Sequence, residues 1–146
     1  MTFLVQYVDS KSGEFLSVYN PNDETLVVEG VHAAGAEDVD AAVDAATKAF
    51  KEWRKWSGPQ RAKVMMKMAD LIERDADKLA RFEVMCMGQP ITVARKFLSG
   101  VAPYWRYYAG FCDKIEGEYF PEDGDARVKI TQYMPFGVCA GIGMYR

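Results

Sequence analysis

The apolar residues in the first part of the chain form short segments, and residues typical of turns separate these segments. Phe3 to Val8 alternates two sets of side chains, and Phe15 to Tyr19 and Thr25 to Val31 have the composition of two further strands. Residues 9–13 (DSKSG) and 20–23 (NPND) contain the residue types that turns favour. The pattern therefore predicts a small antiparallel β-meander.

The next part of the chain repeats its apolar residues every three or four positions, as one face of a helix does. The first stripe consists of Val39, Val43, Ala46, Phe50 and Trp53. Residues 57–59 (SGP) end this helix and begin another, because proline is favoured in the first turn of a helix. Residues 39–53 thus form the first of three predicted helical stretches.

The second helical stretch keeps the same period. Its apolar positions are Met65, Ala69, Ile72, Leu79, Phe82 and Cys86. Asp75 interrupts the stripe, so we expect it to break the helix or to cap it again. Residues 88–90 (GQP) are a clear stop signal.

The third helical stretch again steps by three and four residues. Its apolar positions are Leu98, Val101, Trp105, Tyr108, Cys112 and Ile115. Gly100 and Pro103 lie inside it, and we therefore expect a kink or a restart there. Gly117 is expected to close it.

The last part of the chain returns to strand patterns. A turn at residues 121–125 precedes Arg127 to Thr131, which alternates polar and apolar side chains as a half-exposed strand does. Val138 to Ile142 is apolar on both faces, which predicts a buried parallel strand. Its glycines are typical of a strand that leads into a nucleotide site. The fold class expected from these elements is α/β, or α+β for this chain taken alone.

Composition narrows the class of protein. The 146 residues suffice for one domain, and 49% hydrophobic and 27% charged residues match a soluble globular protein. The net charge of −3 and the scattered basic residues argue against a nucleic-acid partner, and no apolar run reaches the ~20 residues that span a bilayer. The N-terminus lacks the basic and apolar regions of a secretory signal. Three cysteines without a close pair predict free thiols in a reducing compartment, which we expect to be the cytoplasm.

The residue types that could support catalysis have simpler structural explanations. Cys86, Cys112 and Cys139 are expected to be buried apolar thiols, because each lies in an apolar stripe or strand. His32 is the single histidine and is expected at the surface or in a loop, so a metal cluster or a catalytic triad is not expected. The methionines at 65, 66 and 68 and the aromatic residues at 104–108 are interpreted as packing.

Six short motifs, in consistent order and spacing, resemble the N-terminal part of the aldehyde dehydrogenase superfamily. They are SG at 12–13 with NP at 20–21, AATKAFKEW at 45–53, ADLIER at 69–74, Glu83 with GQP at 88–90, RYYAG with DKI and glycine across 106–117, and PFGVC at 135–139. The segment GVCAGIG at 137–143 leans toward betaine-aldehyde-type relatives. The resemblance covers the chain up to Gly143.

The resemblance implies an enzyme that oxidises a small aldehyde to a carboxylic acid with NAD or NADP. In complete relatives a cysteine thiolate attacks the aldehyde, hydride passes to the cofactor, and a glutamate-assisted water releases the acid. An asparagine side chain holds the oxyanion in a segment like (A/P)WN. Met144, Tyr145 and Arg146 hold the places of that segment here, and the other catalytic residues lie further along in relatives. No catalytic residue is therefore assigned in this chain.

The resemblance also assigns parts to the chain. Residues 1–125 would form the N-terminal hairpin and the helical part of a cofactor-binding domain, and residues 126–134 a strand like the oligomerisation arm of the family. Residues 135–146 would form the first strand of a Rossmann-like domain, in which position implies Ile142 and Gly143 as cofactor-binding residues. We do not expect the isolated chain to bind the cofactor, since no helix or acidic residue follows the glycines. Arg127 to Met134 would pair with a second copy or with full-length family subunits.

Three interpretations of the function stay open at this point. The chain is an N-terminal enzyme fragment that is inactive alone, an interaction fragment that pairs with full-length subunits, or a non-functional product. The helices would expose faces meant for a missing sheet, so we expect a marginal, aggregation-prone or partner-dependent fold. Codons for residues 143–145 can contain GTATGT, a common intron start in fungi, so a retained intron is one hypothesis for the end of the chain. A deliberately truncated or a mis-annotated reading frame is the alternative, and the choice between them stays open. The aldehyde, and NAD against NADP, also stay open.

Overall fold

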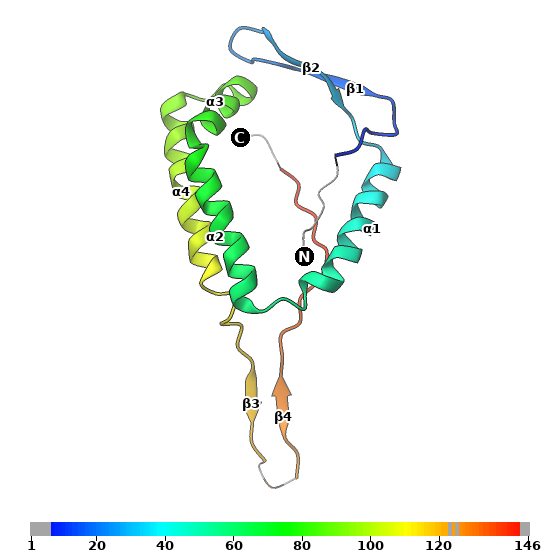
Figure 1. Cartoon of the computed structure of the whole chain (residues 1–146), viewed down its shortest axis with the longest axis vertical. Helices are drawn as coiled ribbons and strands as arrows, with labels where there is room; N and C mark the ends of the chain where they lie inside the picture. Colours follow the sequence, from blue (N-terminus) through cyan, green and yellow to red (C-terminus); the bar gives the residue numbers. More distant parts are fainter. Residues whose placement is uncertain (1–6, 123, 125, 144–146) are drawn as a thin grey trace.

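The computed structural model describes residues 7–122, 124 and 126–143 and shows a mixed arrangement of helices and small antiparallel sheets (Figure 1). Its elements in chain order are β1 (Phe15–Tyr19), β2 (Leu26–His32), α1 (Ala36–Trp53), α2 (Gly58–Arg74), α3 (Ala76–Met87), α4 (Ile91–Ala109), β3 (Glu118–Phe120) and β4 (Lys129–Thr131). β1 pairs with β2 and β3 pairs with β4, each pair forming a two-stranded sheet.

The N-terminal β structure is a hairpin in the described residues. β1 and β2 pair antiparallel with Phe15 opposite His32 and Tyr19 opposite Leu26. Both strands were predicted from their composition, and these predictions are confirmed. A third strand was predicted over Phe3 to Val8. Its first part, up to residue 6, lies outside the described residues. Residues 7 and 8 are not in a strand, so this part of the predicted meander is wrong.

The start and end of α2 and the end of α3 lie where the local signals indicate. Ser57 accepts a hydrogen bond from the Gln60 backbone N–H, and the Ser57 N–H donates to Gln60 Oε1 at 2.8 Å, which together cap α2. Asp75 ends α2, and α3 starts at the next residue, so the predicted break is confirmed and the second helical stretch is two helices. Gly88 adopts a left-handed conformation with φ of 72° and ends α3.

α4 runs without a break through Gly100 and Pro103, so the expected restart does not occur. Proline costs one backbone hydrogen bond, but α4 is long and packs along α2 and α3, which offsets that local loss. The helix ends at Ala109 rather than near Gly117, and a series of turns covers residues 110–113. The apolar period therefore continues past the end of the helix and misplaces its C-terminus.

The core is small and consists of close contacts between α2, α3 and α4. Its fully buried residues are all alanines, namely Ala69, Ala80, Ala94, Ala102 and Ala109. Small side chains let helix backbones approach closely, and ion pairs reinforce the contact at its edge. Arg106 donates to Glu73 and, at 3.1 Å, to Asp70, which ties α4 to α2. The three helices are thus the best-packed unit of the described chain.

α1 stands apart from the three-helix unit (Figure 1). Among the described residues, the elements that pack together are α2 with α4, α3 with α4, α3 with β1, and the strands of each hairpin. α1 buries none of its residues, although its apolar stripe makes it amphipathic. Val39 and Val43 on its apolar stripe are about half exposed, whereas Phe50 and Trp53 near its C-terminal end are half-buried.

The last described segment is extended but is not a strand. Residues 132–143 pass between α1 and α2 in the view of Figure 1, and no backbone hydrogen bond joins them to another described segment. The buried parallel strand predicted over Val138 to Ile142 is therefore wrong for this structure: Val138 is 40% exposed and Ile142 is 93% exposed. The physical reason is that no other described strand lies beside the segment to complete a ladder.

β4 confirms the last three residues of the strand predicted over Arg127 to Thr131, whereas residues 127 and 128 are not in a strand. Its partner β3 was not predicted. Tyr119 lies opposite Ile130 in this hairpin, which points away from the helices (Figure 1). All six strand residues are exposed. A two-stranded hairpin is at best marginally stable without other packing, so this arm has its surface free for contacts.

The accessible surface is large for the size of the chain. A compact globule of 16.4 kDa exposes about 7,500 Å² by the surface–mass relation, whereas this chain exposes 12,330 Å². Exposed large apolar side chains occur on α1, on the arm and on the extended segment, as at Val39, Ile130 and Ile142. Much of the apolar surface is therefore accessible to a partner.

Candidate functional site

The sequence-derived cofactor residues lie at the end of the described chain. Ile142 is exposed, and a side chain placed on Gly143 would meet nothing within 4 Å. The two residues are not brought together with any other polar or charged group, so the described residues form no cradle for a dinucleotide. Their cofactor role stays a prediction that follows from position in the motif.

The cysteines are more accessible than their sequence context indicates. Cys86 and Cys139 are exposed, so the prediction of buried thiols is wrong for both, and Cys112 is half-buried with its Sγ 3.5 Å from Met65 Sδ. The apolar stripe of α3 and the apolar segment around Cys139 are not covered by other described residues. In the described structure the recorded contacts of Cys112 and Cys139 are with different residues, so the thiols do not form one cluster.

Most of the predicted packing residues are also exposed. Tyr104, Tyr107 and Tyr108 on α4 are more than half exposed, and Met66 and Met68 on α2 are about two-fifths exposed. The interpretation as packing is therefore wrong for these five residues, whereas Met65 and Trp105, which belong to the same two predicted sets, are half-buried. The five exposed residues are part of the large apolar area described above.

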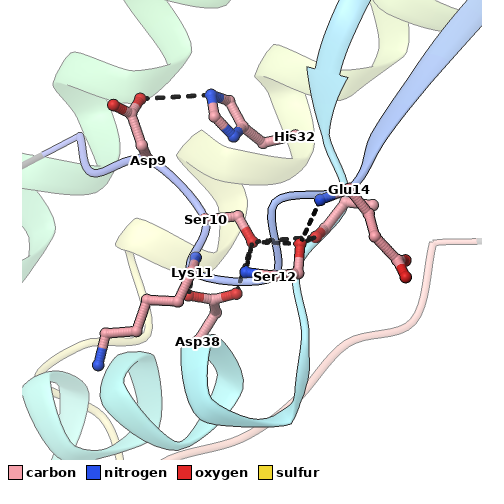
Figure 2. Close-up of polar contacts among 8 residues, drawn as sticks. Asp9, Ser10, Lys11, Ser12, Glu14, His32 and Asp38 are labelled. Carbon is pink, nitrogen blue, oxygen red and sulfur yellow. Dashed lines mark hydrogen bonds and ion pairs between the residues drawn. The ribbon is translucent and has the colours of Figure 1, made fainter.

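His32 lies at the end of β2, at the accessible edge that was expected. Its ring tilts against Phe15 with centroids 4.8 Å apart, and Nε2 is 3.3 Å from Asp9 Oδ1 (Figure 2). This pair is exposed, so it contributes little to stability. No third group joins it, and no group of three metal-ligating side chains occurs within the part of the chain that the structure describes.

The densest polar cluster surrounds Asp38 in the first turn of α1 (Figure 2). Its Oδ2 accepts hydrogen bonds from Ser10 Oγ at 2.7 Å and from the Gly35 N–H at 2.9 Å. Its Oδ1 accepts from the Lys11 N–H at 3.0 Å. One carboxylate thus holds the turn before β1 against the N-terminus of α1.

The same bonds explain the acidity of Asp38. The Ser10 hydroxyl, followed by the two backbone amides, stabilises the carboxylate and lowers the pKa of Asp38 to about 2. A carboxylate with this pKa is a poor proton acceptor at neutral pH. The cluster is therefore a structural anchor and not a catalytic acid or base.

A hollow lies where the arm joins the helices. It has a volume of about 740 Å³ and its walls come from the end of α1, the start of α2, the end of α4 and residues 132–135. Most of its lining is aromatic or apolar, as at Phe50, Met65 and Phe111. A Cβ placed on Gly137 would lie 3.9 Å from the Phe50 ring, so the extended segment passes close to the apolar face of α1.

The start of α2 contacts the turn after α4 at one wall of this hollow. Arg61 donates to the carbonyl of Trp56 at 2.6 Å and to the carbonyl of Cys112 at 2.8 Å. A Cβ on Gly58 would lie 2.7 Å from the Asp113 Cβ and 2.8 Å from the Cys112 carbonyl oxygen. Only glycine at 58 lets the start of α2 approach the turn after α4 so closely.

Sequence reasoning missed the roles of Asp38, Gly58 and Arg61. An aspartate three residues after Gly35 at a helix start is a capping signal, and it could have identified Asp38. Gly58 and Arg61 had no such signal, because the turn at 112–113 is far away in the chain.

The described helices contain no segment long and apolar enough to cross a membrane.

Comparison with known proteins identifies the family. The sequence pattern described as the aldehyde dehydrogenase family matches residues 7–145. Aldehyde dehydrogenase of Aspergillus niger is 38% identical over 138 residues, covering 94% of this chain and 27% of that protein. Human retinal dehydrogenase 2 is 40% identical over 141 residues, with the same shares. The chain therefore spans about 27% of the length of these curated relatives.

Solved structures agree with the sequence comparison. PnpE in complex with nicotinamide adenine dinucleotide matches with a TM-score of 0.76 and 37% identity, over 82% of this chain and 24% of that one. An NADP-dependent enzyme of E. coli matches with a TM-score of 0.80 and 27% identity, over 86% of this chain and 26% of that one. The family pattern matches residues 7–145 and these structures match 82% and 86% of the chain, so the chain belongs to the aldehyde dehydrogenase family, whose N-terminal portion it represents.

Proposed function

We propose that this chain serves the NAD(P)-dependent oxidation of an aldehyde to a carboxylic acid as the N-terminal part of an aldehyde dehydrogenase subunit. The family match over residues 7–145 is the observation that carries this proposal. The chain would supply the helical scaffold and the arm, while the reacting groups would come from the remainder of the subunit. On its own it would be inactive.

The described residues fit the scaffold role and do not fit the cofactor. Ile142 and Gly143 lie on an exposed segment without a neighbouring helix start, and such a start is where a dinucleotide's phosphates bind. The hydrogen bonds recorded for the described thiols join Cys112 to Met65 Sδ and to the Tyr108 carbonyl, and Cys139 to the Gly137 carbonyl, so none of these contacts is with a base that could accept the thiol proton. Catalysis is therefore assigned to no residue of this chain.

A chimera tests the proposal. Residues 7–143 of this chain replace the matched segment of the Aspergillus niger aldehyde dehydrogenase, and aldehyde-dependent NADH formation is measured beside the parent enzyme and the 146-residue chain. We expect activity within about tenfold of the parent for the chimera and none for the chain alone. A soluble, folded chimera without activity would contradict the proposal, and so would activity of the chain alone.

The finer assignment is to betaine-aldehyde-type relatives acting in the cytoplasm. The support is the segment GVCAGIG at 137–143, together with the free thiols. The chimera would shift the ratio of kcat/KM for betaine aldehyde over benzaldehyde upward relative to its parent. An unchanged ratio of kcat/KM would contradict this assignment. The same activity assays, run once with NAD and once with NADP, would show which cofactor the chimera uses.

A second candidate function is an interaction fragment. The arm formed by β3 and β4 projects from the helices, and its exposed apolar side chains include Tyr119 and Ile130. We expect Arg127 to Met134 to pair with a second copy or with a full-length family subunit. Co-purification of the tagged chain with a full-length relative tests this, with Ile130→Lys as the variant that abolishes binding and Val8→Lys as the matched control. Equal recovery of both variants would exclude a role of the arm.

A further inference from the structure

The hairpin of β1 and β2 lies between two helical parts of the molecule (Figure 1). The turn before β1 contacts the start of α1, and the turn after β1 contacts the end of α3. We call these contacts the N-terminal joint, formed by residues 10–12 with Ala33 and Asp38, and the α3 joint, formed by Pro21 with Gly88. Because the joints lie at opposite ends of β1, the hairpin connects α1 to the three-helix unit.

The N-terminal joint is polar. Asp38 accepts hydrogen bonds from Ser10 Oγ and from the Lys11 N–H, as described above. The carbonyl of Ala33, which follows β2 directly, lies within hydrogen-bond distance of the hydroxyl groups of Ser10 and Ser12. The turn before β1 is therefore bonded both to the end of the hairpin and to the first turn of α1 (Figure 2).

The α3 joint is a steric contact. Gly88 ends α3, and a Cβ on it would lie 2.7 Å from Pro21 Cγ and 3.6 Å from Pro21 Cβ. The proline ring thus packs directly on the glycine backbone, at a distance that a larger residue would not allow. The contact holds the turn after β1 against the end of α3.

The hairpin is hydrogen-bonded continuously from one joint to the other. In the turn that carries Pro21, the Asn20 N–H donates to the Thr25 carbonyl at 2.8 Å, and the Thr25 hydroxyl donates to Asp23 Oδ1 at 2.6 Å. β1 then pairs with β2 from Tyr19 back to Phe15. Coupling between distant sites is carried by contiguous networks of this kind, so a displacement at one joint should reach the other.

α1 needs a contact at its start in order to keep its position. Its C-terminal end is linked to α2 through residues 54–57. A helix of 18 residues is about 27 Å long, so a tilt of about 10° at that end would move its start by about 5 Å. A movement of this size would break the hydrogen bonds of the N-terminal joint.

We propose that the β1–β2 hairpin is a strap that couples the end of α3 to the start of α1 and thereby sets the position of α1 on the three-helix unit. Pro21 and Gly88 are then positioning residues for α1, which lies at the other end of the strap. Both joints lie within residues 10–88, so the same coupling is expected in the free chain and in the chimera. The coupling does not depend on the proposed enzymatic function.

Hydrogen exchange followed by mass spectrometry tests the strap in both proteins. Gly88→Ala places a Cβ against the ring of Pro21 and should displace the hairpin turn. We expect exchange of the amides of residues 36–45 to become about fivefold faster or more, with a change of less than about twofold in α2 and α4. Equal acceleration in all helices would show a general loss of stability and would overturn the strap.

A double substitution separates the steric contact from backbone strain at position 88. Gly88→Ala combined with Pro21→Ala keeps the left-handed backbone at 88, but the Cβ now meets the Cβ at 21 at an ordinary 3.6 Å. Exchange of residues 36–45 should return to within about twofold of the original chain. Exchange that stays fast in the folded double variant would overturn the proposal.

Coupling between two sites is reciprocal, so a change at the N-terminal joint should be measurable at the α3 joint. Ser10→Ala removes the hydroxyl bonded to Asp38 and should speed exchange of residues 84–88 about threefold or more. Ser17→Ala, on an exposed residue of β1, is the matched control and should leave exchange there unchanged. Unchanged exchange at the far joint in either folded variant, Gly88→Ala or Ser10→Ala, would overturn the coupling.

Discussion

Single residues fix the joints between elements, and Gly58 is the sharpest case. The Cβ of an alanine would meet the backbone and Cβ of Asp113 at 2.7–2.8 Å, and neither can move without displacing the turn. Gly58→Ala should therefore lower the free energy of unfolding by about 1–3 kcal/mol. Urea unfolding followed by circular dichroism measures it.

Gly100 provides the matched control for this steric argument. It lies inside α4, and a Cβ there would meet nothing within 4 Å. Gly100→Ala should raise the free energy of unfolding by up to about 1 kcal/mol, because alanine is the better helix former. Equal effects of the two substitutions would show that the close approach at Gly58 is not real.

Asp38 makes the stability of the N-terminal joint depend on pH. Its pKa in the folded chain is about 2, below the ordinary value of 3.8, because Ser10 and two amides stabilise the carboxylate. The stabilisation is therefore complete above the ordinary value and is lost as the pH falls toward 2.

Asp38→Asn should lower the urea midpoint at neutral pH and flatten its dependence on pH between about 5 and 2. Asp40→Asn, on an exposed position of the same helix, is the control and should retain the slope of the original chain. An unchanged slope in Asp38→Asn would mean that Asp38 does not anchor the turn before β1.

The elements show which parts of the fold the sequence could predict. The helices were predictable because their stripes repeat every three or four residues, and the break at Asp75 because the stripe is interrupted there. The end of α4 was misplaced, since apolar residues up to Ile115 continue the period through turns. The strand at Val138 to Ile142 was predicted from composition alone, and a strand requires a neighbour that no described residue supplies.

The candidate site was predictable only in part, for a related reason. Family motifs place Ile142 and Gly143 by position, which needs no contact. Asp38 acts through Ser10 and Lys11, and Arg61 through the carbonyl of Cys112, so their roles depend on residues distant in the chain. Periodicity reports on one element at a time and gives no information on such pairs.

The arm is an element that the rest of the fold does not need. Gly117 lies against the carbonyl oxygen of Thr131, so the two ends of the arm are adjacent. Replacing residues 118–131 by two glycines should change the free energy of helix unfolding by less than about 0.5 kcal/mol. Loss of cooperative unfolding in this deletion, followed by circular dichroism at 222 nm, would contradict an independent arm.

At the scale of the whole molecule, the exposed apolar surface is the dominant property. Within the described residues the buried core consists of five alanines, and many larger apolar side chains of α1, α4 and the extended segment are accessible. The chain alone should therefore bind a hydrophobic dye such as ANS strongly at neutral pH, with several-fold higher fluorescence than the chimera. Equal, low fluorescence of both proteins would show that these faces are covered in the free chain.

Hydrogen exchange of the amides of residues 136–143 tests most directly whether this chain is a scaffold that lacks its sheet. Mass spectrometry would follow exchange in the 146-residue chain and in the chimera under identical conditions. In the free chain these amides make no backbone hydrogen bonds to other described residues and should exchange within seconds. In the chimera they should be protected at least about a hundredfold, because the rest of the subunit supplies neighbouring strands. Equal and fast exchange in both proteins would contradict the account.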